Sequence, residues 1–106
     1  MQHAQVFTYV VDLPSLTEYN TRFVDPYAET IAGADGLIFK VWMADWEKQA
    51  FSSFYLWESK AAMEDFMNSP VIADVASQPF LKELIIKDYP VVTEASRRTR
   101  GLRQPA

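Results

Sequence analysis

The sequence predicts an α+β domain with the element order β-α-β-β-α-β, the ferredoxin-like arrangement of a four-stranded antiparallel sheet with two helices on one face. Four segments are rich in β-branched and aromatic residues, as strands are. Two segments between them carry apolar residues at helical spacing. A third observation concerns assembly. The second and third predicted strands are apolar on both faces, whereas the helices of one small domain can cover only one face of the sheet.

The first strand and the first helix are expected between residues 5 and 32. Gln5 to Val11 reads QVFTYVV and predicts a strand. Ser15 and Glu18 match a capping box, in which the two side chains satisfy free backbone donors at a helix start. Pro26 interrupts the helix, so the segment is either two helices or one kinked helix. The apolar stripe of this helix contains Leu16, Tyr19, Phe23, Val24, Tyr27, Ile31 and Ala32.

An antiparallel hairpin is expected over residues 36–58, with strands from Leu37 to Ala44 and from Phe51 to Trp57. The polar segment between the strands indicates a loop longer than a two-residue turn. Strict alternation would place two sets of side chains on opposite faces of the first of these strands. One set is Leu37, Phe39, Val41 and Met43, and the other is Ile38, Lys40, Trp42 and Ala44.

Both sets are apolar except for Lys40, so both faces of the hairpin require a cover. The helices of the same chain can cover one face. Two sheets that stack face to face across a two-fold axis would bury the other. The sequence therefore predicts a homodimer formed through the sheet face.

The second helix is expected to begin after Ser59, which is a good N-cap residue. Its apolar side contains Ala62, Met63, Phe66 and Met67. Pro70 opens a further helical turn over Val71 to Ala76. The last strand is expected from Lys82 to Tyr89, and the polar segment after it is expected to be loose or packed on a partner.

Composition narrows the class of protein. The 106 residues and 12.2 kDa fit one domain, assigned to residues 1–92, with a polar, arginine-rich tail at 93–106. No apolar run has the length of a membrane span, no secretion signal opens the chain, and no cysteine is present, which together predict a cytoplasmic protein. Residues 1–96 hold six Lys/Arg against fourteen Asp/Glu, which argues against nucleic acid as a partner.

The residue types also limit the chemistry. A single histidine and no cysteine argue against nucleophilic triads and against a metal site built from imidazoles. Only three glycines occur, and none forms a phosphate-binding loop. The remaining candidates are the aromatic side chains of the first three strands and the one lysine among them.

A resemblance to a known family rests on the hairpin and the helix after it. Gly36, Lys40 and Trp42 precede the segment Phe54-Tyr55-Leu56-Trp57, and a helix then opens with Glu58-Ser59-Lys60-Ala61-Ala62. This set resembles the YdhR-like monooxygenases of the dimeric α/β-barrel superfamily. The resemblance is firmest over residues 36–62 and covers the element order of about the first ninety residues. Ser52-Ser53 departs from it, because those proteins tend to have a glycine pair there.

The resemblance implies a two-fold dimer whose stacked sheets form a barrel with the helices outside. It implies a pocket between the sheet and the helices of each subunit. It also implies a cofactor-independent monooxygenase that acts on a small electron-rich aromatic or polyketide-like compound, with neither an organic cofactor nor a metal.

Such a reaction needs a substrate that loses a proton and then gives an electron to oxygen, so the protein must deprotonate, orient and exclude water. Lys40 is expected to stabilise the substrate anion, Tyr55 to donate a hydrogen bond to it, and His3 to act as a base if the N-terminus folds over the pocket. The expected substrate-binding residues are Phe7, Tyr9, Trp42, Trp57 and Phe66.

Other interpretations stay open at the level of sequence. Core or dimer packing also explains the aromatic residues, Lys40 could extend its ammonium to the rim of the sheet, and His3 could be a mobile terminal residue. The same pocket would suit a cyclase, isomerase or lyase that transfers protons, and a dimer that binds a small molecule without turnover.

Overall fold

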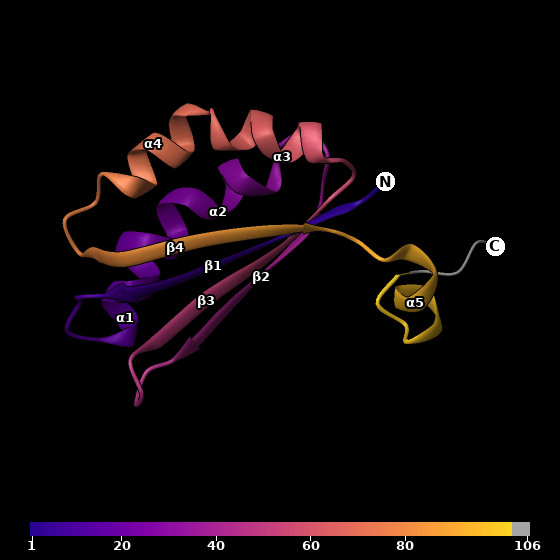
Figure 1. The fold of residues 1–106 in the computed structure, drawn as a ribbon. Helices are drawn as coiled ribbons and strands as arrows, with labels where there is room; N and C mark the ends of the chain where they lie inside the picture. Colours follow the sequence, from indigo (N-terminus) through magenta and orange to yellow (C-terminus); the bar gives the residue numbers. More distant parts are fainter. Residues whose placement is uncertain (103–106) are drawn as a thin grey trace.

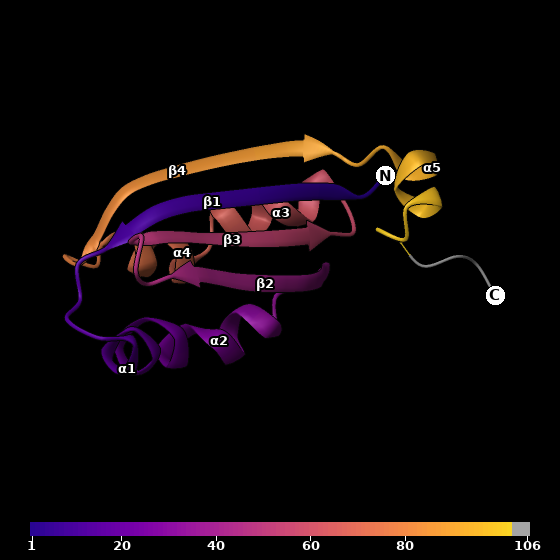
Figure 2. The same ribbon diagram turned by 90° about the horizontal axis from the view of Figure 1, so that it is seen from below.

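One antiparallel sheet organises the fold, and the computed structural model, which describes residues 1–102, confirms the predicted α+β order. The strands pair in the order β2-β3-β1-β4. Helices α1 to α4 lie on one face of the sheet, and no helix of residues 1–102 covers the centre of the other, which we call the open face (Figures 1 and 2). The strands are β1 (His3–Val11), β2 (Leu37–Asp45), β3 (Ala50–Trp57) and β4 (Leu81–Pro90).

The first helical segment is continuous, and a π-helical turn in it accommodates Pro26. It consists of α1 (Leu16–Tyr19), a π-helical turn η1 (Asn20–Val24) and α2 (Asp25–Ala32). Pro26 has no backbone N–H and its ring clashes with the carbonyl four residues earlier in an α-helix, which the wider π-helical turn relieves. The N–H of Asp25 accordingly donates to the carbonyl oxygen of Asn20, five residues earlier.

Two further helices complete the covering layer, α3 (Lys60–Met67) and α4 (Pro70–Ala76). The predicted serine caps are present: Ser15 Oγ accepts from the N–H of Glu18 at 3.2 Å, and Ser59 Oγ accepts from the N–H of Ala62 at 3.1 Å. None of the helices in residues 1–102 is long and apolar enough to cross a membrane.

The segment after β4, which the sequence predicts to be loose or packed on a partner, is partly helical. It forms a short helix, α5 (Thr93–Arg98), which lies beyond the end of the sheet (Figure 1). The N–H of Val91 donates to the carbonyl oxygen of Gln2 at 3.0 Å, so the start of this segment is tied to the first strand. Arg103, the last arginine of the predicted tail, lies outside the described residues.

A β-bulge in β2 corrects the predicted facing of its first residues. Leu37 pairs with Trp57 and Phe39 pairs with Leu56, so Ile38 is an extra residue without a partner in β3. Leu37 therefore packs against the core on the helix side, where strict alternation had placed it with Phe39 on the open side. Beyond the bulge the alternation holds, with Lys40 and Trp42 facing the helices and Val41 facing the open side.

The core between sheet and helices is built largely from aromatic rings. Phe23 lies at its centre, and its ring meets those of Tyr9, Tyr27, Trp42 and Phe80 edge-on, with centroids 5.6 to 6.2 Å apart. Edge-to-face contacts of this kind are favourable because the ring faces are negative and the edges positive. The candidate site lies inside this aromatic layer.

Gly36 fixes the start of β2, and its replacement tests this part of the fold. Its φ is +81°, and an added Cβ would lie 2.5 Å from the Cβ of Ala62. We expect Gly36→Ala to lower the free energy of unfolding by about 1–3 kcal/mol, measured by urea denaturation. Gly33→Ala is the matched control, since its added Cβ would meet only carbonyl oxygens at 3.6 and 3.7 Å. Equal stability of the two variants would contradict this account.

Candidate active site

The interior between sheet and helices contains a small enclosed cavity. Its volume is about 20 Å³, which is the room needed by about one water molecule. Strands supply most of its polar groups, and helices η1, α2 and α4 close it from above. The lining residues that matter for chemistry are Phe7, Tyr9, Phe23, Tyr27, Lys40, Trp42, Ser53 and Tyr55.

Lys40 extends into this aromatic layer from β2. Its Nζ lies 3.3 Å from the centroid of the Trp42 ring and 4.6 Å from that of the Tyr55 ring. Lys40 and Trp42 are two residues apart on one strand, so they share a face, and Tyr55 is the residue paired with Lys40 on β3. The negative faces of the two rings attract the ammonium group.

The amine has aromatic neighbours and lacks an opposite charge. Within residues 1–102, no carboxylate forms an ion pair with Lys40. Burial lowers the pKa of Lys40 from its ordinary 10.5 to about 7. At neutral pH the amine is therefore divided between a form that accepts a proton and a form that stabilises an anion.

Tyr9 and Tyr55 line the cavity with hydroxyl groups that can donate hydrogen bonds. Burial raises the pKa of Tyr55, and the neighbouring Tyr9 raises it further. Burial also raises the pKa of Tyr9. Both phenols thus keep their protons at neutral pH. The hydroxyl of Tyr9 lies 3.0 Å from Ser53 Oγ, and the Oγ of Ser52 donates to the carbonyl oxygen of Phe7 at 2.8 Å.

A surface groove lies on the other side of Lys40, between α2 and the edge strand β2. Its volume is about 220 Å³. Lys40, Trp42 and Ile31 line both the groove and the enclosed cavity. The Lys40 side chain thus lies between an open groove and a buried aromatic cavity.

The structure brings together five of the eight predicted site residues. Phe7, Tyr9, Lys40, Trp42 and Tyr55 line the cavity. Trp57 and Phe66 lie behind Tyr55: the Trp57 ring stacks on it with centroids 5.8 Å apart, and the Phe66 ring lies 4.9 Å from that of Trp57. These two residues pack against Tyr55 and do not line the cavity themselves.

His3 lies apart from the cavity. It is the first residue of β1 and is buried, and its Nε2 lies 2.6 Å from Asp88 Oδ1 on β4. It does not line the cavity. The N-terminus is held in the sheet and does not fold over the site, so the condition under which His3 was expected to act as a base is not met in this structure.

Sequence reasoning missed Ser53, Phe23 and Tyr27 in the lining. Ser53 had a signal, because it stands two residues before Tyr55 on β3 and so faces the same side. Phe23 and Tyr27 had a signal as well, because both belong to the apolar stripe of the first helix, but the polar partners of Tyr27 lie far away in the sequence. The Tyr27 hydroxyl donates to Asp74 Oδ2 at 2.6 Å and accepts from Gln78 Nε2 at 2.7 Å.

The described part of the chain contains no group of three or more His, Cys, Asp or Glu side chains placed to hold a metal ion. The cavity lining offers one amine, phenol and serine hydroxyls, and apolar groups. This set can move a proton and stabilise an anion.

The state of Lys40 predicts a particular pH dependence of stability. Between about pH 7 and 10.5 the unfolded chain binds a proton at Lys40 that the folded protein does not, so stability rises with pH in that window. We expect the difference in unfolding free energy between the wild type and Lys40→Met to shift in favour of the wild type from pH 7 to 10, and to be flat below pH 7. Urea denaturation at each pH measures it, and Lys60→Met on α3 controls for the loss of a positive charge. Parallel profiles for the wild type and Lys40→Met would contradict the buried state of the amine.

Several solved structures share this fold. SnoaB from Streptomyces nogalater, described as a cofactor-independent oxygenase, is 13% identical over 85% of this chain and 92% of its own, with a TM-score of 0.66. Rv0793 from Mycobacterium tuberculosis is 15% identical over 89% of this chain and 99% of its own, with a TM-score of 0.69. A MhuD mutant with two manganese protoporphyrin IX molecules per active site is 19% identical over 85% and 94%, with a TM-score of 0.66. At such identities the likeness shows the fold alone.

The family comparison is more specific. No curated protein matches the chain. The model of the family described as "Putative mono-oxygenase ydhR" matches residues 6–102, which includes every strand and helix described above except the first residues of β1. This match confirms the resemblance seen in the hairpin, and the chain belongs to the ydhR mono-oxygenase family.

Proposed function

We propose that this protein is a cofactor-independent monooxygenase that acts on a small electron-rich aromatic or polyketide-like compound. Membership of the ydhR mono-oxygenase family supports the reaction class. SnoaB, which has the same fold, is described as a cofactor-independent oxygenase. The observation that carries the proposal is the Lys40 amine, held among aromatic rings and without a carboxylate partner in the described part of the chain.

In the proposed first step, neutral Lys40 takes a proton from a phenol or from an activated carbon of the bound substrate. The ammonium that results stays beside the new anion and stabilises it in a site of low polarity. The Tyr55 hydroxyl, which keeps its proton, donates a hydrogen bond to the same anion. We assign the base to Lys40, and His3, away from the cavity and paired with Asp88, keeps strands β1 and β4 in place.

The anion then gives electrons to dioxygen. For a methylene group between aromatic rings, one oxygen atom becomes a carbonyl on that carbon. The other oxygen atom leaves as water with the two hydrogens of the methylene group. The substrate supplies both electron pairs, so the balance needs no external reductant. The protein excludes bulk water and holds the substrate anion in position.

Substrate entry requires the helix layer to move. The enclosed cavity of about 20 Å³ and the groove of about 220 Å³ are together smaller than the ~300–1,000 Å³ usual for ligand pockets. We propose that α2 moves away from β2, so that the groove and the cavity join around Lys40 and Trp42. The π-helical turn at the start of α2 is a suitable hinge, because such turns interrupt the regular helix and are frequent at functional sites.

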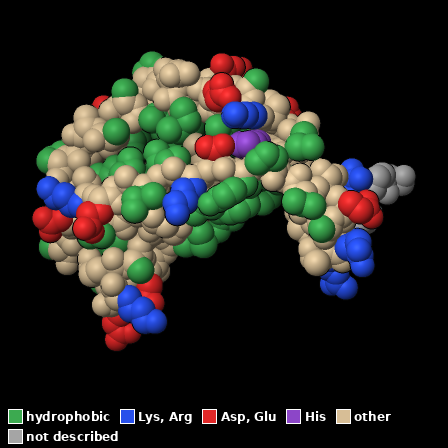
Figure 3. All heavy atoms as spheres, in the orientation of Figure 1, with side chains coloured by type: hydrophobic (Ala, Val, Ile, Leu, Met, Phe, Trp, Pro, Cys, Tyr) green, Lys and Arg blue, Asp and Glu red, His purple; other side chains and the backbone are tan. Residues whose placement is uncertain are grey.

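We also propose that the working unit is a homodimer formed through the open face. Large apolar side chains are exposed there, including Val41 at 45% and Ile85 at 54%, and the rings of Phe39 and Phe54 stack with centroids 5.9 Å apart. Figure 3 shows hydrophobic side chains gathered along this face. A continuous apolar surface of this kind marks an association site, and a second copy offers a matching one. The cytoplasm remains the proposed location, on the ground that the chain has no cysteine.

Oxygen consumption tests the proposed activity. With anthrone-type and quinol-type substrates, we expect the wild type to consume dioxygen and to incorporate one atom of labelled oxygen into the product, with an unchanged rate after treatment with a chelator. Lys40→Met should lower kcat by roughly 10²–10⁴-fold, because it removes the proton acceptor and keeps the side-chain length. Lys60→Met is the control and should keep the wild-type rate.

The other functions give different results in the same experiment. Conversion of such a substrate without oxygen, at the aerobic rate, would replace the oxygenase with a cyclase or isomerase that uses the same amine. Tight binding without conversion of any of these compounds would indicate a binding protein. Full activity of Lys40→Met would remove the amine from the mechanism.

A further inference from the structure

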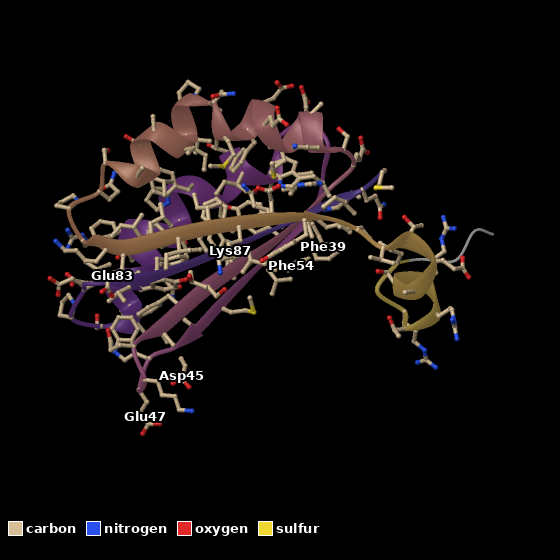
Figure 4. All side chains as sticks on the ribbon, in the orientation of Figure 1. Phe39, Asp45, Glu47, Phe54, Glu83 and Lys87 are labelled. Carbon is tan, nitrogen blue, oxygen red and sulfur yellow. The ribbon has the colours of Figure 1, made fainter. Side chains whose placement is uncertain are left out.

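Lys40 differs from the other lysines of the chain in the surroundings of its side chain. It projects from β2 toward the helices and is partly buried. Lys87, labelled in Figure 4, is also a strand residue, but it points to the open side of the sheet. The other four lysines are all exposed: Lys48, Lys60, Lys82 and Lys87. Among residues 1–102, Lys40 is therefore the one lysine that lines an apolar interior.

The groove between α2 and β2 gives a small molecule a path to this side chain. Its volume of about 220 Å³ lies below the ~300–1,000 Å³ usual for drug-sized ligands, so it suits a smaller molecule. Ala28 and Ile31 line it from α2, and Leu37 and Phe39 line it from β2. Among the described residues of this lining, Lys40 alone carries a charge. The groove thus matches a small apolar molecule with one group that can react with an amine.

The Lys40 amine has the properties of a nucleophile. An unprotonated lysine amine attacks carbonyl carbon, and lysines desolvated in hydrophobic pockets form Schiff bases in this way. No carboxylate of residues 1–102 forms an ion pair with Lys40, so no fixed negative charge holds its proton in place. Burial lowers the pKa of Lys40 to about 7, so a large fraction of the amine is unprotonated at neutral pH.

The rings beside the Lys40 nitrogen would also stabilise the product of such a reaction. A Schiff base that takes up a proton becomes an iminium, which carries its positive charge on the former amine nitrogen. The Lys40 Nζ lies 3.3 Å from the centroid of the Trp42 ring and 4.6 Å from that of the Tyr55 ring. The negative faces of these rings attract an iminium as they attract an ammonium group.

We propose that Lys40 forms a Schiff base with a small apolar aldehyde or ketone that enters through the groove between α2 and β2. The nitrogen lone pair bonds to the carbonyl carbon, and both hydrogens of the amine leave with the carbonyl oxygen as one water molecule. No oxidant or reductant takes part. This activity goes beyond the proposed oxygenation, because it needs neither dioxygen nor an acidic proton on the ligand. It also needs no movement of α2, since Lys40 already lines the groove.

Reductive trapping on the full chain tests the covalent bond. The protein is incubated at pH 7 with benzaldehyde and cyanoborohydride, which reduces a Schiff base to a stable secondary amine. Digestion and mass spectrometry then measure the modification of each lysine over time. We expect Lys40 to react at least roughly tenfold faster than Lys60, because a lysine of ordinary pKa is almost wholly protonated at pH 7. In urea-unfolded protein, where the burial is lost, the two lysines should react at similar rates.

The route through the groove has a test of its own. Ala28→Phe places a ring in the groove from α2. We expect it to slow the trapping of Lys40 several-fold and to leave that of Lys60 unchanged. Ala73→Phe on α4 is the matched control, because Ala73 is exposed and lines neither the groove nor the cavity. Circular dichroism checks that both variants are folded.

A second carbonyl compound tests the apolar character of the ligand without any substitution. Glyoxylate presents an aldehyde next to a carboxylate, and the lining of the groove is apolar apart from Lys40. Burial of a charged group without a partner is unfavourable. We therefore expect the ratio of Lys40 to Lys60 modification to be several-fold lower with glyoxylate than with benzaldehyde.

Three results would overturn the proposal. Trapping of Lys40 no faster than that of Lys60 in the folded protein would show that the amine is not a reactive nucleophile. Unchanged trapping of Lys40 in folded Ala28→Phe would show that the aldehyde does not enter through the groove. Equal selectivity with glyoxylate and benzaldehyde would remove the preference for apolar compounds. The oxygen assay is read separately, so a protein that traps benzaldehyde at Lys40 without consuming dioxygen would keep this inference and lose the proposed oxygenase.

Discussion

The β-bulge at the start of β2 decides which face of the sheet every later residue of that strand occupies. Leu37 is held on the helix side by its pairing with Trp57, and the carbonyl oxygen of Gly36 accepts from the N–H of Glu58 at 2.8 Å. If Ile38 took a regular paired position instead of bulging, strict alternation from Leu37 would turn Lys40 and Trp42 to the open face, because a shift of one residue exchanges the two faces of a strand. Gly36 has no Cβ, which permits the close approach to Ala62 of α3, and it adopts the positive φ of +81° without strain.

The same alternation explains why one short strand serves two different purposes. The residues facing the helices place an amine among aromatic rings, where burial lowers its pKa to about 7. The residues facing the open side, Phe39, Val41 and Met43, form an apolar surface that a single copy leaves exposed. The candidate site and the proposed contact surface thus lie back to back, separated by the thickness of the sheet.

Much of this could be predicted from the sequence, and the exceptions have physical reasons. The order of the elements, the serine caps and the apolar hairpin were predictable because each depends on residues that are close together in the sequence. The bulge escaped prediction because no residue in Leu37-Ile38-Phe39 distinguishes a bulge from a regular strand. The polar partners of His3 and Tyr27, which are Asp88 and Asp74, escaped prediction because they are distant in the sequence. The α5 helix escaped because six polar and small residues carry no apolar stripe of their own.

The central claim is that the buried Lys40 amine inside the aromatic layer is partly unprotonated at neutral pH, and its titration measures this directly. In protein with ¹³C-labelled lysines, the ε-carbon signal of Lys40, assigned by its loss in Lys40→Met, is followed by NMR across the pH range. The account predicts a midpoint of about 7, with ring-current shifts from the Trp42 and Tyr55 rings. A midpoint near the ordinary 10.5, with no ring-current shift, would show that the amine lies in water and would contradict the account.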